Sequence, residues 1–275
     1  MLAALVIVFR EMIEAGLIVG IVLAASRGVR GRWRMVGGGI AGGVLGACVL
    51  AAFAGELASL FEGSGQELLQ VTVLLAAVAM LTWHNVWMSS HGREMARQLR
   101  DVGRGVSAGE RPPMALAIVV GIAVLREGSE VVLFLYGVLA SGGSTAAGVA
   151  AGGALGVAAG GLVAALMYGG LLAIPAHRLF SATSWLITLL AAGMAAQAAS
   201  FLQQGGFVDL WGTPLWNTSW LLSDGSIAGR LAHTLVGYTD QPDGLQLAAW
   251  AATIAIIWSL GRAVRRPAPA RPAHA

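Results

Sequence analysis

Seven stretches of this 275-residue sequence are apolar over about 20 residues or more, which is the length that an α-helix needs to cross a lipid bilayer. Only 11% of the residues are charged, whereas a soluble domain usually carries about a quarter. Such a chain could not keep its surface in water. The sequence therefore predicts an all-α integral membrane protein with seven transmembrane helices, near residues 2–25, 35–60, 66–90, 113–140, 145–174, 180–204 and 244–262.

Arginines gather on one side of these predicted spans. All 17 basic residues are Arg, and 14 of them fall in the first, third and fifth connections or in the C-terminal tail. Because cytoplasmic loops are enriched in basic residues, this side is predicted to be the cytoplasm. The N-terminus is then outside the cytoplasmic (inner) membrane and the C-terminus is inside the cell. The pI of about 9.7 reflects this sorting, and no nucleic-acid partner is expected.

The chain repeats itself. The motif Arg-Glu-x-x-Glu at residues 10–14 recurs at residues 126–130, an offset of 116. Weaker matches pair 38–47 with 156–165 and 74–77 with 189–192, at offsets of 118 and 115. A nearly constant offset predicts two copies of a three-helix unit, and an odd number of helices per unit makes the copies inverted relative to each other.

The predicted organisation follows from the repeat. The first three-helix repeat is 1–92 and the second is 113–204, and the Arg-rich cytoplasmic loop 93–112 joins them. An extracytoplasmic loop, 205–243, contains a short helix around 226–237 and precedes the seventh transmembrane helix, 244–262. A cytoplasmic tail, 263–275, ends the sequence.

Both motifs place charge near the middle of a predicted span. A charged residue at the bilayer centre costs about 2.5–3.5 kcal/mol on insertion scales, so six of them need a reason. Residues three and four apart share one face of a helix, so each motif presents one guanidinium and two carboxylates to one side. Inverted repeats usually place the substrate site at the midplane, between the copies. The predicted site consists of Arg10, Glu11, Glu14, Arg126, Glu127 and Glu130.

Four carboxylates repel one another unless a cation lies among them. Oxygen ligands suit hard or borderline metal ions. One alternative is an Arg–Glu lattice that only joins two helices. Another is an intramembrane metal-dependent enzyme, although the sequence contains neither Glu-x-x-His nor His-Glu-x-x-His, and no catalytic residues are predicted.

With two Arg-Glu-x-x-Glu motifs in the first and fourth of seven predicted spans, the chain resembles the oxidase-dependent iron permease family, which includes fungal high-affinity iron permeases and bacterial EfeU-type transporters. The resemblance runs from Arg10 to the seventh span. It implies an iron permease, not an enzyme, that imports iron across the cytoplasmic membrane. It also implies that the iron-binding residues are Glu11, Glu14, Glu127 and Glu130, and that Arg10 and Arg126 are the motif arginines.

The resemblance further implies that iron is the transported substrate and that no cofactor is permanently bound. Extracytoplasmic partners, either iron-binding proteins or an oxidase or peroxidase, would be separate chains, and membrane lipid surrounds the bundle. Some relatives are associated with lead, so a carrier for another divalent cation such as lead stays an alternative. Three polar residues are possible pathway residues: His84 toward the exit or as a proton relay, and Glu67 and Gln197 toward the entrance.

Overall fold

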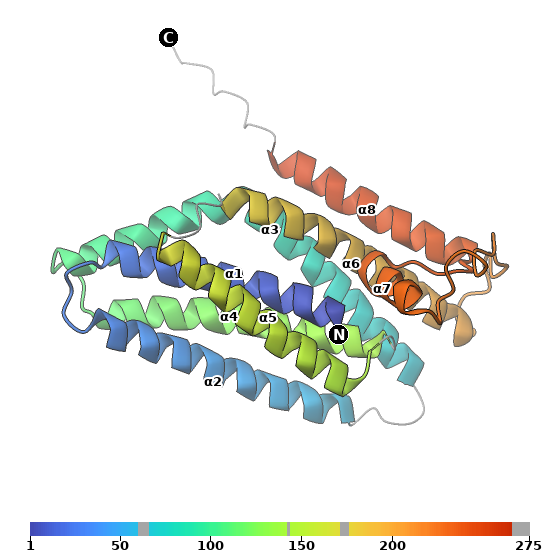
Figure 1. Ribbon diagram of the computed structural model, residues 1–275, viewed down its shortest axis with the longest axis horizontal. Coiled ribbons are helices and arrows are strands. Elements are labelled where there is room, and N and C mark those ends of the chain that lie inside the picture. Colours follow the sequence, from blue (N-terminus) through green and yellow to red (C-terminus); the bar gives the residue numbers. More distant parts are fainter. Residues whose placement is uncertain (60–65, 142–143, 171–175, 266–275) are drawn as a thin grey trace, which may run out of the picture.

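A computed structural model describes residues 1–59, 66–141, 144–170 and 176–265, and within these ranges the chain forms helices and no strands (Figure 1). The helices are α1 (Leu2–Ala25), α2 (Arg32–Ser59), α3 (Gln66–Ser107), α4 (Met114–Ala140), α5 (Ala146–Tyr168), α6 (Ala176–Gln204), α7 (Ile227–Val236) and α8 (Gly244–Arg265). The prediction of an all-α protein is confirmed, and so is the short helix in the segment 205–243.

Five helices are long and apolar enough to cross a membrane: α2, α3, α5, α6 and α8. The remaining long helices, α1 and α4, have 24 and 27 residues, which is also sufficient length, but each carries three charged residues of an Arg-Glu-x-x-Glu motif near its middle. The chain is therefore a membrane protein, and the count of seven spans stays a prediction that depends on these two charged helices.

The Arg-rich segment 93–112 is largely helical instead of a loop, because α3 continues through it to Ser107. Its Met, Ala, Gln, Leu and Arg side chains favour helix, and the helix interior has no proline. Leu99 and Val106 on this extension are buried in an apolar cluster with Val22 and Leu23 of α1. The many arginines of the segment predicted a loop. Its helix propensity and its buried apolar face instead make it a continuation of α3.

The bundle pairs helices across the two predicted repeats. α2 packs along α4, and α5 packs along α1 (Figure 1). Glycines allow both approaches: a Cβ on Gly43 of α2 would lie 2.8 Å from the Gly121 carbonyl oxygen of α4, and one on Gly160 of α5 would lie 2.7 Å from the Phe9 carbonyl oxygen of α1. Small residues at such contacts bring membrane helices together. The second helix of each predicted repeat thus packs on the first helix of the other, as expected of two interlocked units. The repeat itself stays a prediction.

Two apolar clusters divide the bundle along its length. The first contains Ile7 of α1 and Phe134 of α4, and the second contains Ile18 of α1 and Val120 of α4. The charged motifs lie between them in sequence on both helices. The polar centre therefore lies between two packed apolar clusters.

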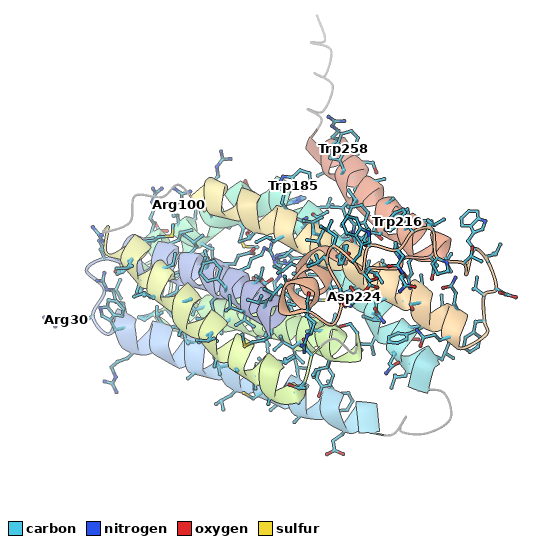
Figure 2. All side chains as sticks on the ribbon, turned by 45° about the vertical axis from the view of Figure 1, so that its right-hand side comes forward. Arg30, Arg100, Trp185, Trp216, Asp224 and Trp258 are labelled. Atoms are coloured by element: carbon cyan, nitrogen blue, oxygen red, sulfur yellow. The ribbon has the colours of Figure 1, made fainter. Side chains whose placement is uncertain are left out.

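The two ends of the molecule differ in charge. Arg30 and Arg100 lie toward one end, whereas Trp216 and Asp224 lie in the segment around α7 toward the other (Figure 2). This second end also holds the N-terminus of α1 (Figure 1). The separation is the one that the positive-inside rule requires if the arginine end faces the cytoplasm. Which end faces the cytoplasm stays a prediction.

Candidate functional site

The first motif lies on the buried face of α1. Arg10 is 3% exposed, Glu11 is 1% exposed and Glu14 is 2% exposed. The Arg10 guanidinium donates to Glu11 Oε1 at 2.8 Å and forms an ion pair with Glu14 Oε1 at 2.6 Å. One arginine thus contacts both carboxylates of its own motif, and the spacing of four residues between Arg10 and Glu14 allows it.

The second motif, on α4, is paired differently. The Arg126 Nε donates to Glu130 Oε1 at 3.2 Å, and the guanidinium lies over the Trp87 ring of α3, 4.4 Å from its centroid. The Arg126 side chain is 31% exposed, unlike that of Arg10. Glu127 is buried, and its Oε2 has no hydrogen-bond partner among the described residues. This motif therefore holds one of its carboxylates by an ion pair and leaves an oxygen of the other unpartnered.

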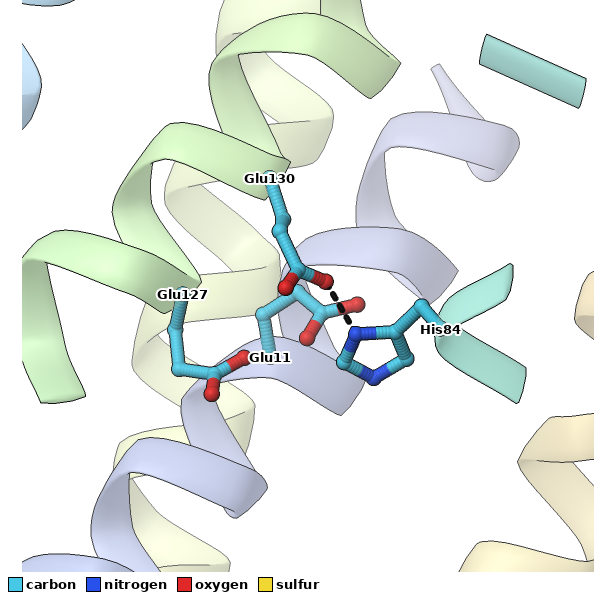
Figure 3. Close-up of side chains that lie close together, drawn as sticks. All are labelled: Glu11, His84, Glu127 and Glu130. Carbon is cyan, nitrogen blue, oxygen red and sulfur yellow. Dashed lines mark ion pairs between the residues drawn. The ribbon is translucent and has the colours of Figure 1, made fainter. Parts of the chain in front are cut away.

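His84 of α3 lies between the two motifs. Its imidazole is 2% exposed, with Nε2 3.3 Å from Glu14 Oε2 of α1 and Nδ1 in contact with Glu130 Oε2 of α4. Figure 3 shows the ring facing Glu130, with Glu11 beside it and Glu127 opposite. The single histidine therefore bridges helices from both halves of the chain.

Four of these side chains converge on one point. Ligand atoms of Glu11, His84, Glu127 and Glu130 all lie within 4.8 Å of one another, and all four residues are buried (Figure 3). One buried oxygen of each of these three glutamates, Oε2, has no hydrogen-bond partner in the described part of the chain, and the same holds for both oxygens of the neighbouring Glu14. Leaving a buried polar atom unsatisfied costs about 1–3 kcal/mol, and more for a charged one. A cation in this cluster would satisfy all three oxygens at once.

The charges of the centre do not cancel. Four glutamates face two arginines and one histidine, and one arginine is partly exposed. Like charges this close in an apolar environment repel one another strongly. The arrangement can bind a metal cation through carboxylate oxygens and one imidazole nitrogen, and the described residues place no other such group of ligands together.

The structure brings together all six predicted motif residues and adds His84, which the sequence had suggested only for the pathway. Gln197 lies apart from the cluster, on α6, where it lines a cavity of about 30 Å³ with Ala3, Ser141 and His233. The side chain of Glu67 lies outside the described residues. Trp87 was not predicted at all, although it lies three residues from His84 in α3 and contacts Arg126.

Comparison with known proteins gives one consistent result. The profile of the iron permease FTR1 family matches residues 1–261. The chain is similar to the ferrous iron permease EfeU of Escherichia coli O6:H1, with 31% identity over 255 residues that cover 91% of each chain. The EfeU protein of Shigella sonnei gives the same identity and coverage. That of Yersinia pestis is 29% identical over 248 residues, covering 88% of this chain and 86% of its own. No solved structure matches the chain.

Proposed function

The chain belongs to the iron permease FTR1 family, and from this premise we propose that it carries ferrous iron across the cytoplasmic membrane through the buried cluster between α1, α3 and α4. It is a permease and not an enzyme, as the family assignment establishes. The observation that carries the proposal is the convergence of Glu11, His84, Glu127 and Glu130 within 4.8 Å, midway along the motif helices.

The energetics of the cluster support a site that holds a cation. The carboxylates of α1 and α4 are taken out of water, which disfavours their charged forms unless positive charge is near. Arg10 supplies part of that charge through its ion pairs with Glu11 and Glu14, and Arg126 supplies part through its ion pair with Glu130. The arginines reduce the repulsion among the carboxylates when no metal is bound, and the remaining negative charge attracts the metal.

The path into the site begins at the end that carries α7. The cavity of about 30 Å³ lined by Gln197 lies there, beside Ala3 at the start of α1. Acidic residues of the segment 205–243 raise the local concentration of cations at this end. We assign this end to the extracytoplasmic side, so that iron entering there moves inward.

The path out of the site is closed by aromatic packing. Trp87 lies three residues beyond His84 toward the arginine end of α3, and its ring packs under the Arg126 guanidinium. The Trp87 ring also stacks on His91, with 5.2 Å between the centroids. Release into the cytoplasm requires this layer to separate, by movement of α3 relative to α4. A separate extracytoplasmic protein that delivers or oxidises iron completes the proposal.

The test is uptake of radioactive ferrous iron into sealed proteoliposomes under anaerobic conditions. Glu127→Gln removes one carboxylate charge from the cluster and keeps its volume, so uptake should fall at least about tenfold, the loss that one charge-assisted interaction of about 1.4 kcal/mol corresponds to. Glu110→Gln, at an exposed site between α3 and α4, is the matched control and should transport like the wild type. Wild-type uptake by a folded Glu127→Gln protein would refute the site.

A further inference from the structure

We infer that His84 is a direct ligand of the transported metal and that Glu14 is a positioning residue that holds the imidazole, so that the ligand set is three carboxylates and one imidazole nitrogen instead of four carboxylates. The inference rests on the proposed function and refines it. It assigns different roles to the two glutamates of the first motif, which the sequence pattern treats alike.

The position of its carboxylate separates Glu14 from the other three glutamates. Glu14 Oε1 forms an ion pair with Arg10 at 2.6 Å and Oε2 lies 3.3 Å from His84 Nε2, although neither oxygen accepts a hydrogen bond among the described residues. Glu130 is paired in a similar way, with Oε1 at Arg126 and Oε2 at His84 Nδ1, and Glu11 pairs Oε1 with Arg10 and leaves Oε2 without a partner among the described residues. Glu14 also falls outside the group of mutually close ligand atoms. Its carboxylate therefore contacts His84 from outside the point at which the other ligand atoms converge.

The His84 ring is oriented as a metal ligand would be. Its two nitrogens face different carboxylates. Nε2 lies toward Glu14, and Nδ1 lies toward Glu130 within the cluster (Figure 3). Histidines that bind metals usually donate the N–H of the second nitrogen to a carboxylate, which fixes the tautomer and the ring orientation. Without a metal, Nδ1 lies against Glu130 Oε2. A metal inserted between these two atoms would bind Nδ1 and leave Nε2–H facing Glu14 Oε2, 3.3 Å away. Arg10 forms an ion pair with the other oxygen of Glu14, Oε1.

An imidazole nitrogen changes which metals the site prefers. Carboxylate-only sites suit Mg²⁺, Ca²⁺ and Mn²⁺, whereas imidazole suits first-row ions such as Fe²⁺, Ni²⁺ and Zn²⁺. The substrate class is accordingly a borderline divalent transition metal. His84 is the residue that makes the site favour these ions over Mg²⁺ and Ca²⁺, which carboxylates alone would accept.

Pulsed EPR on the detergent-solubilised full chain, with Mn²⁺ as the probe, tests the direct bond. We expect wild-type protein to show spin-echo modulation from a coordinated ¹⁴N nucleus. His84→Gln should still bind Mn²⁺ through the carboxylates but lose the nitrogen coupling. His91→Gln is the matched control, because His91 lies on the same helix but is exposed, and it should keep the coupling.

Variants at Glu14 test the division of roles. Glu14→Gln keeps a side-chain oxygen that accepts the Nε2–H, so the nitrogen coupling should persist and Mn²⁺ affinity should fall less than tenfold. Glu14→Leu removes the acceptor, and affinity should fall about 10–100-fold, as is typical when the partner of a ligating histidine is lost. If Glu14→Gln abolished binding as fully as Glu127→Gln does, Glu14 would be a ligand and its positioning role would be wrong.

Competition during iron uptake tests selectivity. Ni²⁺ should inhibit wild-type uptake far more strongly than Ca²⁺ does, and His84→Gln should bring the two inhibition constants closer together. Equal discrimination in wild type and His84→Gln would contradict the specificity role.

The role of His84 and the proposed transport site can be overturned separately. Mn²⁺ that binds to wild type, is lost in Glu127→Gln and shows no nitrogen coupling would overturn the role of His84 and leave the proposed transport site intact. Absence of any Mn²⁺ binding that depends on Glu127 would overturn both.

Discussion

At the scale of single residues, the two motif arginines are not equivalent. Arg10 is buried and contacts two buried carboxylates, whereas Arg126 contacts one carboxylate, lies over Trp87 and has a side chain that is 31% exposed. Removing one partner of a buried ion pair leaves an uncompensated charge, and the cost grows with the burial of that charge. The identical motif therefore places different demands on the two helices.

This asymmetry predicts unequal losses of stability. Arg10→Leu should destabilise the protein by about 3–5 kcal/mol, the usual effect of breaking a buried pair, because Glu11 and Glu14 both lose their cation. Arg126→Leu should cost less, since Arg126 is partly exposed and pairs with a single glutamate. Thermal unfolding midpoints of both variants in detergent measure the difference. Equal midpoints, or a lower one for Arg126→Leu, would contradict the assignment of Arg10 as the better-buried partner.

The six motif residues could be predicted from sequence, because spacings of three and four residues fix which side chains share a helix face. The central position of His84 could not. The repeat offset of 115 that relates the two Leu-Leu-Ala-Ala segments matches His84 with Ala199, so internal symmetry points away from it. Only the packing of α3 against α1 and α4 brings this imidazole to the cluster.

At the scale of helices, glycine positions decide which pairs can approach. Gly160 of α5 would place a Cβ 2.7 Å from the Phe9 carbonyl oxygen, whereas a Cβ on the adjacent Gly161 would meet only the flexible end of Met12, at 3.8 Å. The two neighbours thus form a natural pair of test and control positions.

Most helix bounds followed from hydropathy, but the extension of α3 through 93–107 required knowledge that Leu99 and Val106 are buried.

Adding one methyl group should have different effects on stability at Gly160 and at Gly161. Gly160→Ala forces α5 away from α1 and should destabilise the protein by about 1–3 kcal/mol, the usual cost of overpacking. Gly161→Ala should be neutral or slightly stabilising, since alanine favours helix more than glycine does. Thermal unfolding midpoints check both. A Gly160→Ala protein as stable as Gly161→Ala would mean that α1 and α5 do not pack this closely.

The segment around α7 is fastened by a reciprocal pair of hydrogen bonds. The Asp224 N–H donates to Asp240 Oδ2 and the Asp240 N–H donates to Asp224 Oδ1, both at 3.2 Å. Partial burial raises the pKa of Asp224 and outweighs the lowering effect of the hydrogen bond from the Asp240 N–H, while the Asp240 carboxylate raises this pKa and His233 lowers it. The folded protein therefore holds this proton more tightly than the unfolded chain does, so the contribution of Asp224 to stability falls as pH rises from 3.8 through the higher folded pKa.

Asp224→Asn keeps an acceptor for the Asp240 N–H and removes the charge. The variant should equal or slightly exceed the wild type in thermal stability near neutral pH, by less than about 0.5 kcal/mol. This gain should disappear in acid, where Asp224 of the wild type is protonated as well. Unfolding midpoints measured across the acidic range check the trend. A gain that grows on acidification would have the wrong sign.

At the scale of the whole molecule, the orientation depends on where the arginines lie. The structure separates an arginine end from the end with α7, but the direction of the bundle in the membrane follows only from the positive-inside rule. The fold class followed from composition alone because lipid admits few architectures. The packing of α2 and α5 against the opposite predicted repeat could not be predicted from composition, since it depends on contacts between distant parts of the chain.

Cysteine labelling checks the orientation. Cys48 is the only cysteine, so Cys48→Ala provides a background without reactive thiols. Ser219→Cys, in the exposed segment near α7, should react in intact cells with a maleimide that cannot cross the membrane. Glu110→Cys, exposed between α3 and α4, should react only after the cells are opened. The reverse labelling pattern would invert the assigned direction of transport.

The central claim is that iron binds between the two motifs, and anomalous X-ray scattering tests it most directly. Crystals of the full chain grown anaerobically with ferrous iron should show a peak at the iron absorption edge among Glu11, His84, Glu127 and Glu130. The peak should vanish in crystals of Glu127→Gln grown in the same way. A peak confined to the segment 205–243, or no iron near either motif in well-ordered crystals, would contradict the account.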